Sequence, residues 1–285
     1  MNAIEITNLS KNYDGFCLKN VNITMPQGSV MGFIGQNGAG KTTTIKALLN
    51  LIKRDDGEIK IFGLENIKNE EEIKQQISVV FDEPCFHDIL TAKQINQIFK
   101  HIYREWSEET FFNYMTKFEL PLKRKFKVFS RGMRMKMQIA VALSHNAKLL
   151  ILDEPTSGLD PVVRNEMLDV FMEYMQNEER SILISSHITV DLEQIADYIT
   201  FINKGGILLS GRKDEILESY GIIKCGKDDS AKIAKEDIVA SKVTEFGTEM
   251  MVSDRQKCKA KYPGLIIDKA TLDEIMVFHV KGVTK

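Results

Sequence analysis

The sequence predicts an α/β fold built around a largely parallel β-sheet. Short runs rich in valine and isoleucine alternate with longer amphipathic segments along the 285 residues, as expected when strands and helices alternate along the chain. Val30–Ile34 is a nearly continuous apolar run followed by a glycine, which is typical of a buried strand that feeds a loop. Residues 41–51 then have helical character. The sequence contains neither internal repeats nor low-complexity tracts.

The other predicted elements of the core follow the same alternation. Apolar and polar residues alternate at residues 3–7 and 21–25, as in strands with one buried face. Core strands are predicted at residues 77–81, 149–152, 181–185 and 198–202, a helix at residues 162–175, and a hairpin turn at residues 204–206 that leads to a strand at residues 207–210.

Two regions differ from this core. Residues 83–147 have mostly helical periodicity, strongest at 91–104, 108–118 and 133–144, and predict a helical subdomain inserted into the core. From residue 221 the sequence predicts a small α+β extension, with short strands at 222–225, 243–246 and 265–267 and a closing helix at 272–280. We therefore expect one domain at residues 1–220 and an accessory domain at 221–285, which supports packing or dimer formation.

Composition excludes several classes of protein. The net charge is −2 with acidic and basic residues interspersed, whereas a general nucleic-acid binder has a basic face or tail. The four cysteines are scattered, which predicts neither a zinc site nor a disulfide framework. No apolar run approaches the ~18 residues of a spanning helix. We expect a chain on the cytoplasmic side of the membrane, reaching it only through a partner.

The segment Gly35-Gln36-Asn37-Gly38-Ala39-Gly40-Lys41-Thr42 matches the phosphate-binding pattern GxxxxGK[ST]. It lies between a predicted strand and a predicted helix, which is the context that this motif requires. Its backbone N–H groups and the dipole of the following helix favour phosphate oxygens. A glycine-rich turn without a ligand is the alternative, and the length of the match argues against it. The residues expected to bind nucleotide are Gly35, Asn37, Gly38, Ala39, Gly40, Lys41, Thr42 and Thr43.

Two adjacent carboxylates, Asp153 and Glu154, follow the buried-strand pattern at residues 149–152. Ligands of doubly wound folds bind at such strand ends. Asp153 and the Thr42 hydroxyl are oxygen ligands that suit Mg²⁺. Glu154 is the candidate general base that polarises the attacking water. Acidic residues after a strand are also common as plain caps, and the phosphate loop is what favours a role in ATP hydrolysis.

Three further motifs accompany the loop and the acidic pair in a fixed order. Phe129-Ser130-Arg131-Gly132-Met133 precedes the acidic pair, Pro155-Thr156-Ser157-Gly158-Leu159-Asp160 follows it, and Ser185-Ser186-His187 ends the next predicted strand. Over roughly residues 2–217, this order resembles the nucleotide-binding subunits of ABC transporters. The resemblance implies a P-loop NTPase (RecA-like) core with an antiparallel β subdomain, and a chain that binds and hydrolyses ATP with Mg²⁺.

The resemblance also implies roles for single residues. Ser130 and Gly132 would contact the γ-phosphate bound to the opposite subunit, and Asp160 would be the acidic residue of the loop between subunits. His187 would be the switch histidine, which contacts the γ-phosphate and orients the catalytic carboxylate or water. Tyr13 would stack on adenine, although a plain surface tyrosine is the alternative.

The implied assembly has two ATPase subunits, identical or different, and a transmembrane permease. In this arrangement each ATP lies between the phosphate loop of one subunit and the signature of the other. Coupling to the permease would run through the region near Asp82 and residues 84–90, where Phe86 would contact a permease helix.

Two sites depart from the family pattern, the position of Asp82 and the signature. Asp82 stands where a glutamine is usual, and we expect it to approach the metal ion while tuning hydrolysis differently, because an ionised carboxylate only accepts hydrogen bonds. Arg131 stands where a glycine is usual and Met133 where a glutamine is usual. Such departures resemble a bacterial subgroup associated with export of bacitracin-like antibiotics, other peptides and drugs.

Other functions remain as alternatives. A soluble ABC ATPase that acts on a non-membrane partner would usually carry a second nucleotide-binding half or a long coiled coil, and this sequence has neither. A P-loop small-molecule kinase does not account for the signature, the loop at Asp160 and His187 together. The alternative that is hardest to exclude is a regulatory protein that binds nucleotide without hydrolysing it. The presence of Glu154 argues against this alternative.

Overall fold

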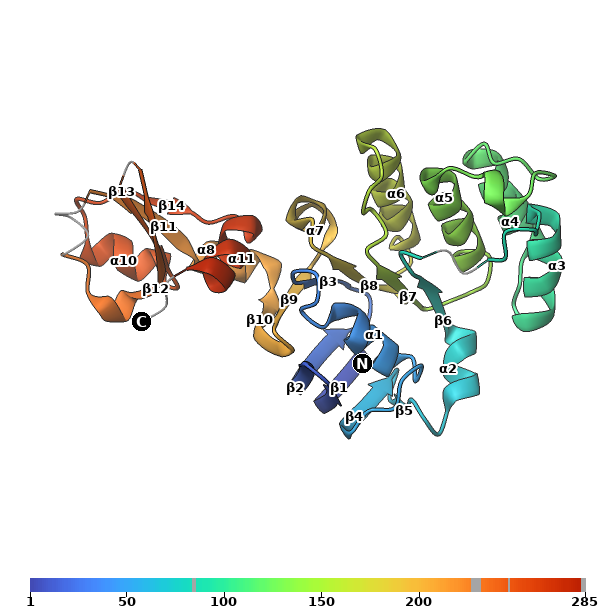
Figure 1. Ribbon diagram of the computed structural model, residues 1–285, viewed down its shortest axis with the longest axis horizontal. Helices are drawn as coiled ribbons and strands as arrows, with labels where there is room; N and C mark the ends of the chain where they lie inside the picture. The colour runs from blue at the N-terminus through green and yellow to red at the C-terminus, as the bar shows by residue number, and fades with distance from the viewer. Residues whose placement is uncertain (84–85, 227–231, 246, 283–285) are drawn as a thin grey trace.

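The computed structural model describes residues 1–83, 86–226, 232–245 and 247–282, which form three β-sheets with helices around them (Figure 1). The central six-stranded sheet has the order β10-β9-β3-β8-β7-β6. All its neighbouring strands are parallel except the β9–β10 pair. The predicted α/β core with a largely parallel sheet is therefore confirmed.

The central sheet and its helices have the bounds β3 Val30–Ile34, α1 Lys41–Leu48, β6 Ile77–Val80, β7 Leu149–Asp153, α6 Pro161–Tyr174, β8 Ser181–Ser186, α7 Thr189–Ile195, β9 Tyr198–Asn203, β10 Gly206–Arg212 and α8 Lys213–Ser219. Every residue of β3, β7 and β8 is buried, because these strands lie inside the sheet with both faces covered. Their carboxyl ends lie at one edge, where the loops carry the predicted motifs.

A second, antiparallel sheet has the order β2-β1-β4-β5 and packs below the central sheet in Figure 1. Its strands are β1 Asn2–Tyr13, β2 Phe16–Pro26, β4 Asp56–Ile61 and β5 Leu64–Glu65. Alternate residues such as Ile4, Ile6 and Ile23 point into a hydrophobic cluster shared with β3 and α1. This sheet is the antiparallel β subdomain that the family resemblance implies. The short helix α2 Glu70–Gln76 leads from it back to β6.

Three helices between β6 and β7 form a layer at one side of the molecule (Figure 1). They are α3 Ala92–Ile102, α4 Glu108–Lys117 and α5 Arg131–Ala142, with a 3₁₀ turn at Phe126–Val128. Phe111 is completely buried among them. Thr91 begins α3 with a capping box, and Ser107 and Ser130 cap α4 and α5. These caps satisfy N–H groups that lack partners within the helix.

The chain ends in a third sheet of order β12-β13-β11-β14, flanked by helices. Its elements are β11 Gly221–Cys225, a 3₁₀ turn Lys235–Asp237, β12 Ile238–Thr244, β13 Gly247–Val252, α10 Arg255–Lys261, β14 Ile267–Lys269 and α11 Leu272–Lys281. Helix α11 packs on α7, and its Ile275 and Phe278 belong to the same hydrophobic cluster as Leu192 and Phe201 of the core. The extension therefore shares a core with the domain before it.

Several predicted boundaries shifted. The strand predicted at residues 243–246 is wrong in extent, because β12 ends at Thr244 and β13 starts at Gly247 to form a hairpin; residue 246 lies outside the described residues. The strand predicted at residues 265–267 begins only at Ile267. The helix predicted to end at residue 51 ends at Leu48. In the described part of the chain, no helix is long and apolar enough to cross a bilayer.

Candidate nucleotide-binding site

A cavity of about 650 Å³ opens at the carboxyl ends of β3 and β7. Its position agrees with the rule that ligands of open α/β sheets bind beyond these strand ends. The cavity brings the predicted phosphate loop and both predicted carboxylates together. Its lining consists of Gly15, Phe16, Gln36, Asn37, Gly38, Gly40, Lys41, Thr42, Thr43, Asp82, Asp153 and Glu154.

The loop before α1 has the tight curvature that the motif predicts. Gly40 has a φ angle of +116°, and a Cβ atom there would lie 2.7 Å from Cδ2 of Leu18, so only glycine fits. The Nζ atom of the buried Lys41 donates to the Gly35 carbonyl at 2.6 Å. Ala39 is also buried and supports the turn by donating its N–H to the Gln36 carbonyl at 3.0 Å. The lysine thus lies folded against its own loop.

Thr42 and Asp153 meet although they are far apart in the sequence. The Thr42 Oγ1 hydroxyl donates to Oδ2 of Asp153 at 2.8 Å. The other carboxylate oxygen of Asp153 accepts a hydrogen bond from the Ser185 hydroxyl at the end of β8. Asp153 is buried, so these bonds fix its carboxylate in one orientation. Ser185 was missed as a site residue; its place at the carboxyl end of a predicted strand was the available signal.

Glu154 lies between two nitrogen groups. Its Oε1 atom is 3.0 Å from Nζ of Lys41, and its Oε2 atom is 2.7 Å from Nδ1 of His187. Its backbone has a φ angle of +54°, which is uncommon for a residue with a side chain and is found at functional turns. The Glu154 N–H donates to the Ser185 carbonyl at 3.1 Å, which supports this turn.

The oxygen atoms of Thr42 and Asp153 fit the preference of Mg²⁺ for hard ligands. This ion commonly takes only one or two protein ligands and completes its shell with waters and substrate phosphates. The described residues contain no cluster of three or more histidine, cysteine, aspartate or glutamate side chains placed to hold a metal ion.

The three residues predicted to act between subunits lie away from this lining. Ser130 accepts a hydrogen bond from the Met133 N–H at 3.3 Å and so caps α5. Asp160 caps α6 by accepting from the N–H groups of residues 162 and 163, each at 3.0 Å. Gly132 lies near Val163 at the start of the same two helices. Among the described residues, those that line the cavity include none of these three.

Of the predicted residues Tyr13 and Asp82, the cavity lining includes Asp82. Tyr13 is the last residue of β1, 47% exposed, with the Lys11 ammonium 5.3 Å from its ring centre. The aromatic side chain that lines the cavity is Phe16, which sequence reasoning missed. Asp82 lines the cavity, and its Oδ1 atom accepts a hydrogen bond from Nη2 of Arg131 at 2.6 Å.

The segment predicted to meet the permease continues from Asp82, and its residues 84 and 85 lie outside the described residues. The Phe86 ring packs edge to face on Phe99 and Phe126, with centroid distances of 5.8 and 5.4 Å. Ile89 is the strongly exposed apolar side chain of this segment, at 69%.

Known proteins are similar to this chain over nearly three quarters of its length. The family model described as ABC transporter matches residues 18–157. The bacitracin transport ATP-binding protein BcrA of Bacillus licheniformis is 38% identical over a match that covers 72% of this chain and 68% of the relative. The lantibiotic transport ATP-binding protein SrtF of Streptococcus pyogenes is 37% identical, with 74% and 91% covered.

A solved structure described as the ATP-binding subunit of an ABC transporter superposes with a TM-score of 0.69 at 28% identity. The match covers 75% of this chain and 91% of that one, which confirms the predicted fold class of a P-loop NTPase with antiparallel β and helical subdomains. Given this fold and the extent of the similarity to BcrA and SrtF, the chain belongs to the ABC transporter family, as one of the ATP-binding subunits that hydrolyse ATP to energise transport.

Proposed function

We propose that the chain hydrolyses Mg²⁺-bound ATP in the cavity beyond β3 and β7, and that hydrolysis drives a separate permease for peptide antibiotics or drugs. The observation that carries the chemical part is the arrangement of the Glu154 carboxylate between Lys41 and His187. The substrate class rests on the similarity to the bacitracin and lantibiotic transport proteins.

In this proposal the phosphate loop binds the phosphates of ATP, and Glu154 acts as the general base. The Lys41 ammonium and the N–H groups of the loop neutralise and hold the phosphates. Glu154 accepts a proton from the attacking water, and its contact with Nδ1 of His187 at 2.7 Å holds the carboxylate in place. A base fixed by two nitrogen groups needs little reorganisation during the reaction, which favours turnover.

We further propose that Thr42 and Asp153 hold Mg²⁺, with Asp82 able to approach it. The ion would neutralise phosphate charge when bound. The Thr42 hydroxyl, which donates to Asp153 at 2.8 Å, also has lone pairs for a metal. Ser185 would keep the second oxygen of Asp153 directed away from the ion by its hydrogen bond.

The placement of the signature residues supports a dimer. Ser130, Gly132 and Asp160 cluster at the starts of α5 and α6, outside the cavity of their own chain. Helix N-termini favour anions, so this face is suited to phosphates held by a second subunit. We infer that two ATPase subunits enclose each nucleotide, as a homodimer or with a related chain.

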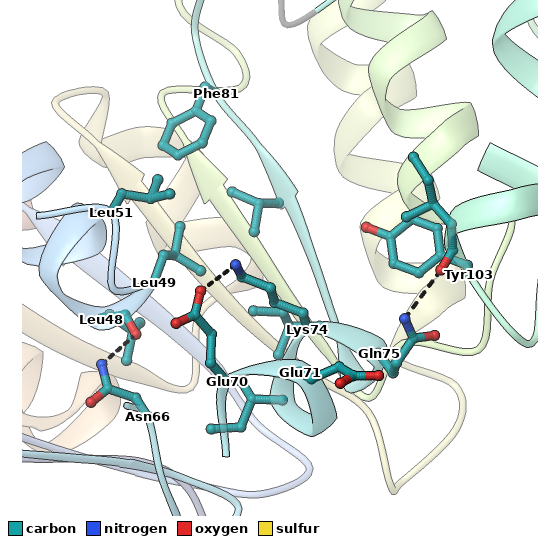
Figure 2. Close-up of a pocket in the computed structure, with 14 residues that line it drawn as sticks. Leu48, Leu49, Leu51, Asn66, Glu70, Glu71, Lys74, Gln75, Phe81 and Tyr103 are labelled. Carbon is teal, nitrogen blue, oxygen red and sulfur yellow. Dashed lines mark hydrogen bonds and ion pairs between the residues drawn. The ribbon is translucent and has the colours of Figure 1, made fainter. Parts of the chain in front are cut away.

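The permease contact is proposed for the pocket in Figure 2, of about 380 Å³, between α1, α2 and α3. Its lining is mainly apolar and includes Leu49, Phe81 and Tyr103. At its rim Leu51 and Ile102 are 56% and 51% exposed. Because Phe81 directly precedes Asp82, an apolar permease helix bound here would contact the chain beside the nucleotide site. The membrane location of the chain rests on this contact.

The chemical part is tested by Glu154→Gln. The amide cannot accept the proton, so we expect kcat to fall by roughly 10²–10⁴-fold while binding of ATP, measured with a fluorescent analogue, remains. The exposed Glu178→Gln is the matched control and should keep full activity. Rapid ATP hydrolysis by Glu154→Gln would show that Glu154 is not the general base.

The assembly is tested by a pull-down of tagged chain from native membranes in gentle detergent, followed by mass spectrometry and an ATPase assay. Recovery of a multi-span protein that stimulates hydrolysis would support the permease. Recovery of soluble partners only would favour the alternative of a soluble ABC ATPase.

The docking pocket is tested by Leu51→Glu and Ile102→Glu. Both should reduce recovery of the permease and leave the ATPase activity of the isolated chain unchanged. Val243→Glu places the same charge on the C-terminal extension, at a side chain that is 78% exposed, and should recover the permease normally. Equal recovery with all three variants would exclude this pocket.

A further inference from the structure

Of the three residues that depart from the family pattern, Asp82 and Arg131 contact each other. Asp82 follows β6, and Arg131 is the first residue of α5. Nη2 of Arg131 donates to Oδ1 of Asp82 at 2.6 Å, across 49 positions of the sequence. The glutamine and glycine usual at these positions could form no ion pair. The two departures are therefore complementary, and together they add an ionic link between the central sheet and the helical layer.

Asp82 faces two cavities. It lines the nucleotide-binding cavity together with Thr42 and Asp153, the proposed metal ligands. It also lines a second cavity of about 350 Å³ with Arg131 and Phe129. The carboxylate thus lies on the boundary between the nucleotide site and the start of α5, and Arg131 holds it from one side.

Arg131 also contacts the turn that follows Glu154. Gly158 in that turn has a φ angle of +66°, and a Cβ atom on it would lie 2.9 Å from Cζ of Arg131. The guanidinium group therefore packs directly against the glycine backbone, where a side chain would displace it. Arg131 joins three segments: the residues after β6, the start of α5 and the turn between Glu154 and α6.

The ion pair is accessible to solvent. The side chains of Arg131 and Asp82 are 54% and 46% exposed, and exposed ion pairs stabilise weakly. A divalent cation nearby competes effectively for such a carboxylate, because its charge is double and it prefers oxygen ligands.

We propose that Arg131 is a positioning residue that competes with the metal site for Asp82. This inference rests on the proposed binding of Mg²⁺ and ATP in the cavity. While Asp82 is paired with Arg131, it is linked through this arginine to α5 and to the turn at Gly158. When the Asp82 carboxylate turns into the cavity to bind the metal ion, its hydrogen bond to Arg131 is broken. Metal binding thereby releases the start of α5, where the signature residues Ser130 and Gly132 lie.

The test measures the Mg²⁺ concentration that gives half-maximal binding of a fluorescent ATP analogue to the full chain. Arg131→Gln frees Asp82, so we expect this concentration to fall by roughly two- to fivefold, the range set by an exposed ion pair. Arg131→Lys keeps the charge and should stay close to the unaltered chain. In an Asp82→Asn background, Arg131→Gln should have no effect, because the competition is gone.

A control separates the ion pair from the general loss of positive charge. Lys127→Gln removes an exposed cation from the turn just before α5 and should leave the Mg²⁺ dependence unchanged. An equal fall with Lys127→Gln, or a fall that persists in the Asp82→Asn background, would overturn the proposal, and so would no change with Arg131→Gln. In all three cases, intact nucleotide binding by the unaltered chain would leave the proposed function standing. Failure of the unaltered chain to bind nucleotide at any Mg²⁺ concentration would contradict both this inference and the proposed function.

Discussion

Protonation of His145 should weaken the fold between pH 6.5 and pH 4. His145 lies in the loop between α5 and β7 with only 6% of its surface exposed, and its ring stacks on Tyr103 at a centroid distance of 3.7 Å. Its Nε2 atom is 2.6 Å from Oγ of Ser78. The Ser78 hydroxyl donates its single proton to the Ala142 carbonyl, so Nε2 carries the hydrogen in this contact.

Burial lowers the pKa of His145 from 6.5 to about 4, because the charged ring would lose its hydration. The neutral ring therefore contributes its full stabilisation of the native state above pH 6.5. Between pH 6.5 and pH 4 the unfolded chain binds the proton and the native chain does not, so this contribution is lost as the pH falls. The full effect is about 3 kcal/mol. Between pH 7.5 and pH 5 the loss is about 2 kcal/mol.

The assay is urea denaturation of the chain and of His145→Gln at several pH values. The substitution costs stability at pH 7.5 because packing and the contact with Ser78 are lost. That cost should shrink by about 2 kcal/mol at pH 5, since the glutamine does not titrate. His101→Gln, at an exposed position of α3, is the matched control for loss of a histidine. Parallel pH profiles for the chain and His145→Gln would refute the reasoning.

Three other predictions concern the site and its support. Lys41→Ala should weaken binding of a fluorescent ATP analogue by roughly ten- to a hundredfold, as loss of a hydrogen bond to a charged group does; unchanged affinity would contradict the phosphate loop assignment. Phe111→Ala should lower the free energy of unfolding by about 3–5 kcal/mol, measured in urea, because the ring is fully buried. Arg164→Met should cost about 3 kcal/mol in the same assay, since it leaves the buried carboxylate of Asp191 without its ion-pair partner, and Arg164→Lys should retain much of that stability.

Local patterns predicted the core and the phosphate loop well, because their physical causes are local. Val30–Ile34 and Leu149–Asp153 are buried on both faces, so an apolar run alone indicated each strand. Helix α2 was missed, since it has seven residues and buries only Ile73. One strand was predicted at residues 243–246, where β12 ends and the hairpin turns into β13, because Val243 and its neighbours alternate weakly and most side chains of β12 are not fully buried.

Contacts between distant segments could not be predicted from spacing. Asp153 was expected at a metal site, and its fixation by Ser185 depends on the register of β7 and β8, where these two residues pair directly. The contact between Asp82 and Arg131 joins a strand end to a helix start. Each residue alone was recognised as unusual, but only the folded chain brings them together.

The way in which α11 closes the chain has a consequence for how this protein can be shortened. The Leu272 N–H donates to Oε1 of Glu193 at 2.7 Å, and Phe278 packs in the same cluster as Leu192 and Phe201. Truncation after residue 220 would therefore expose to solvent the apolar side chains of α7 and β9 that α11 covers. The smallest soluble version of this ATPase should include the C-terminal extension, even though the catalytic motifs all end well before it.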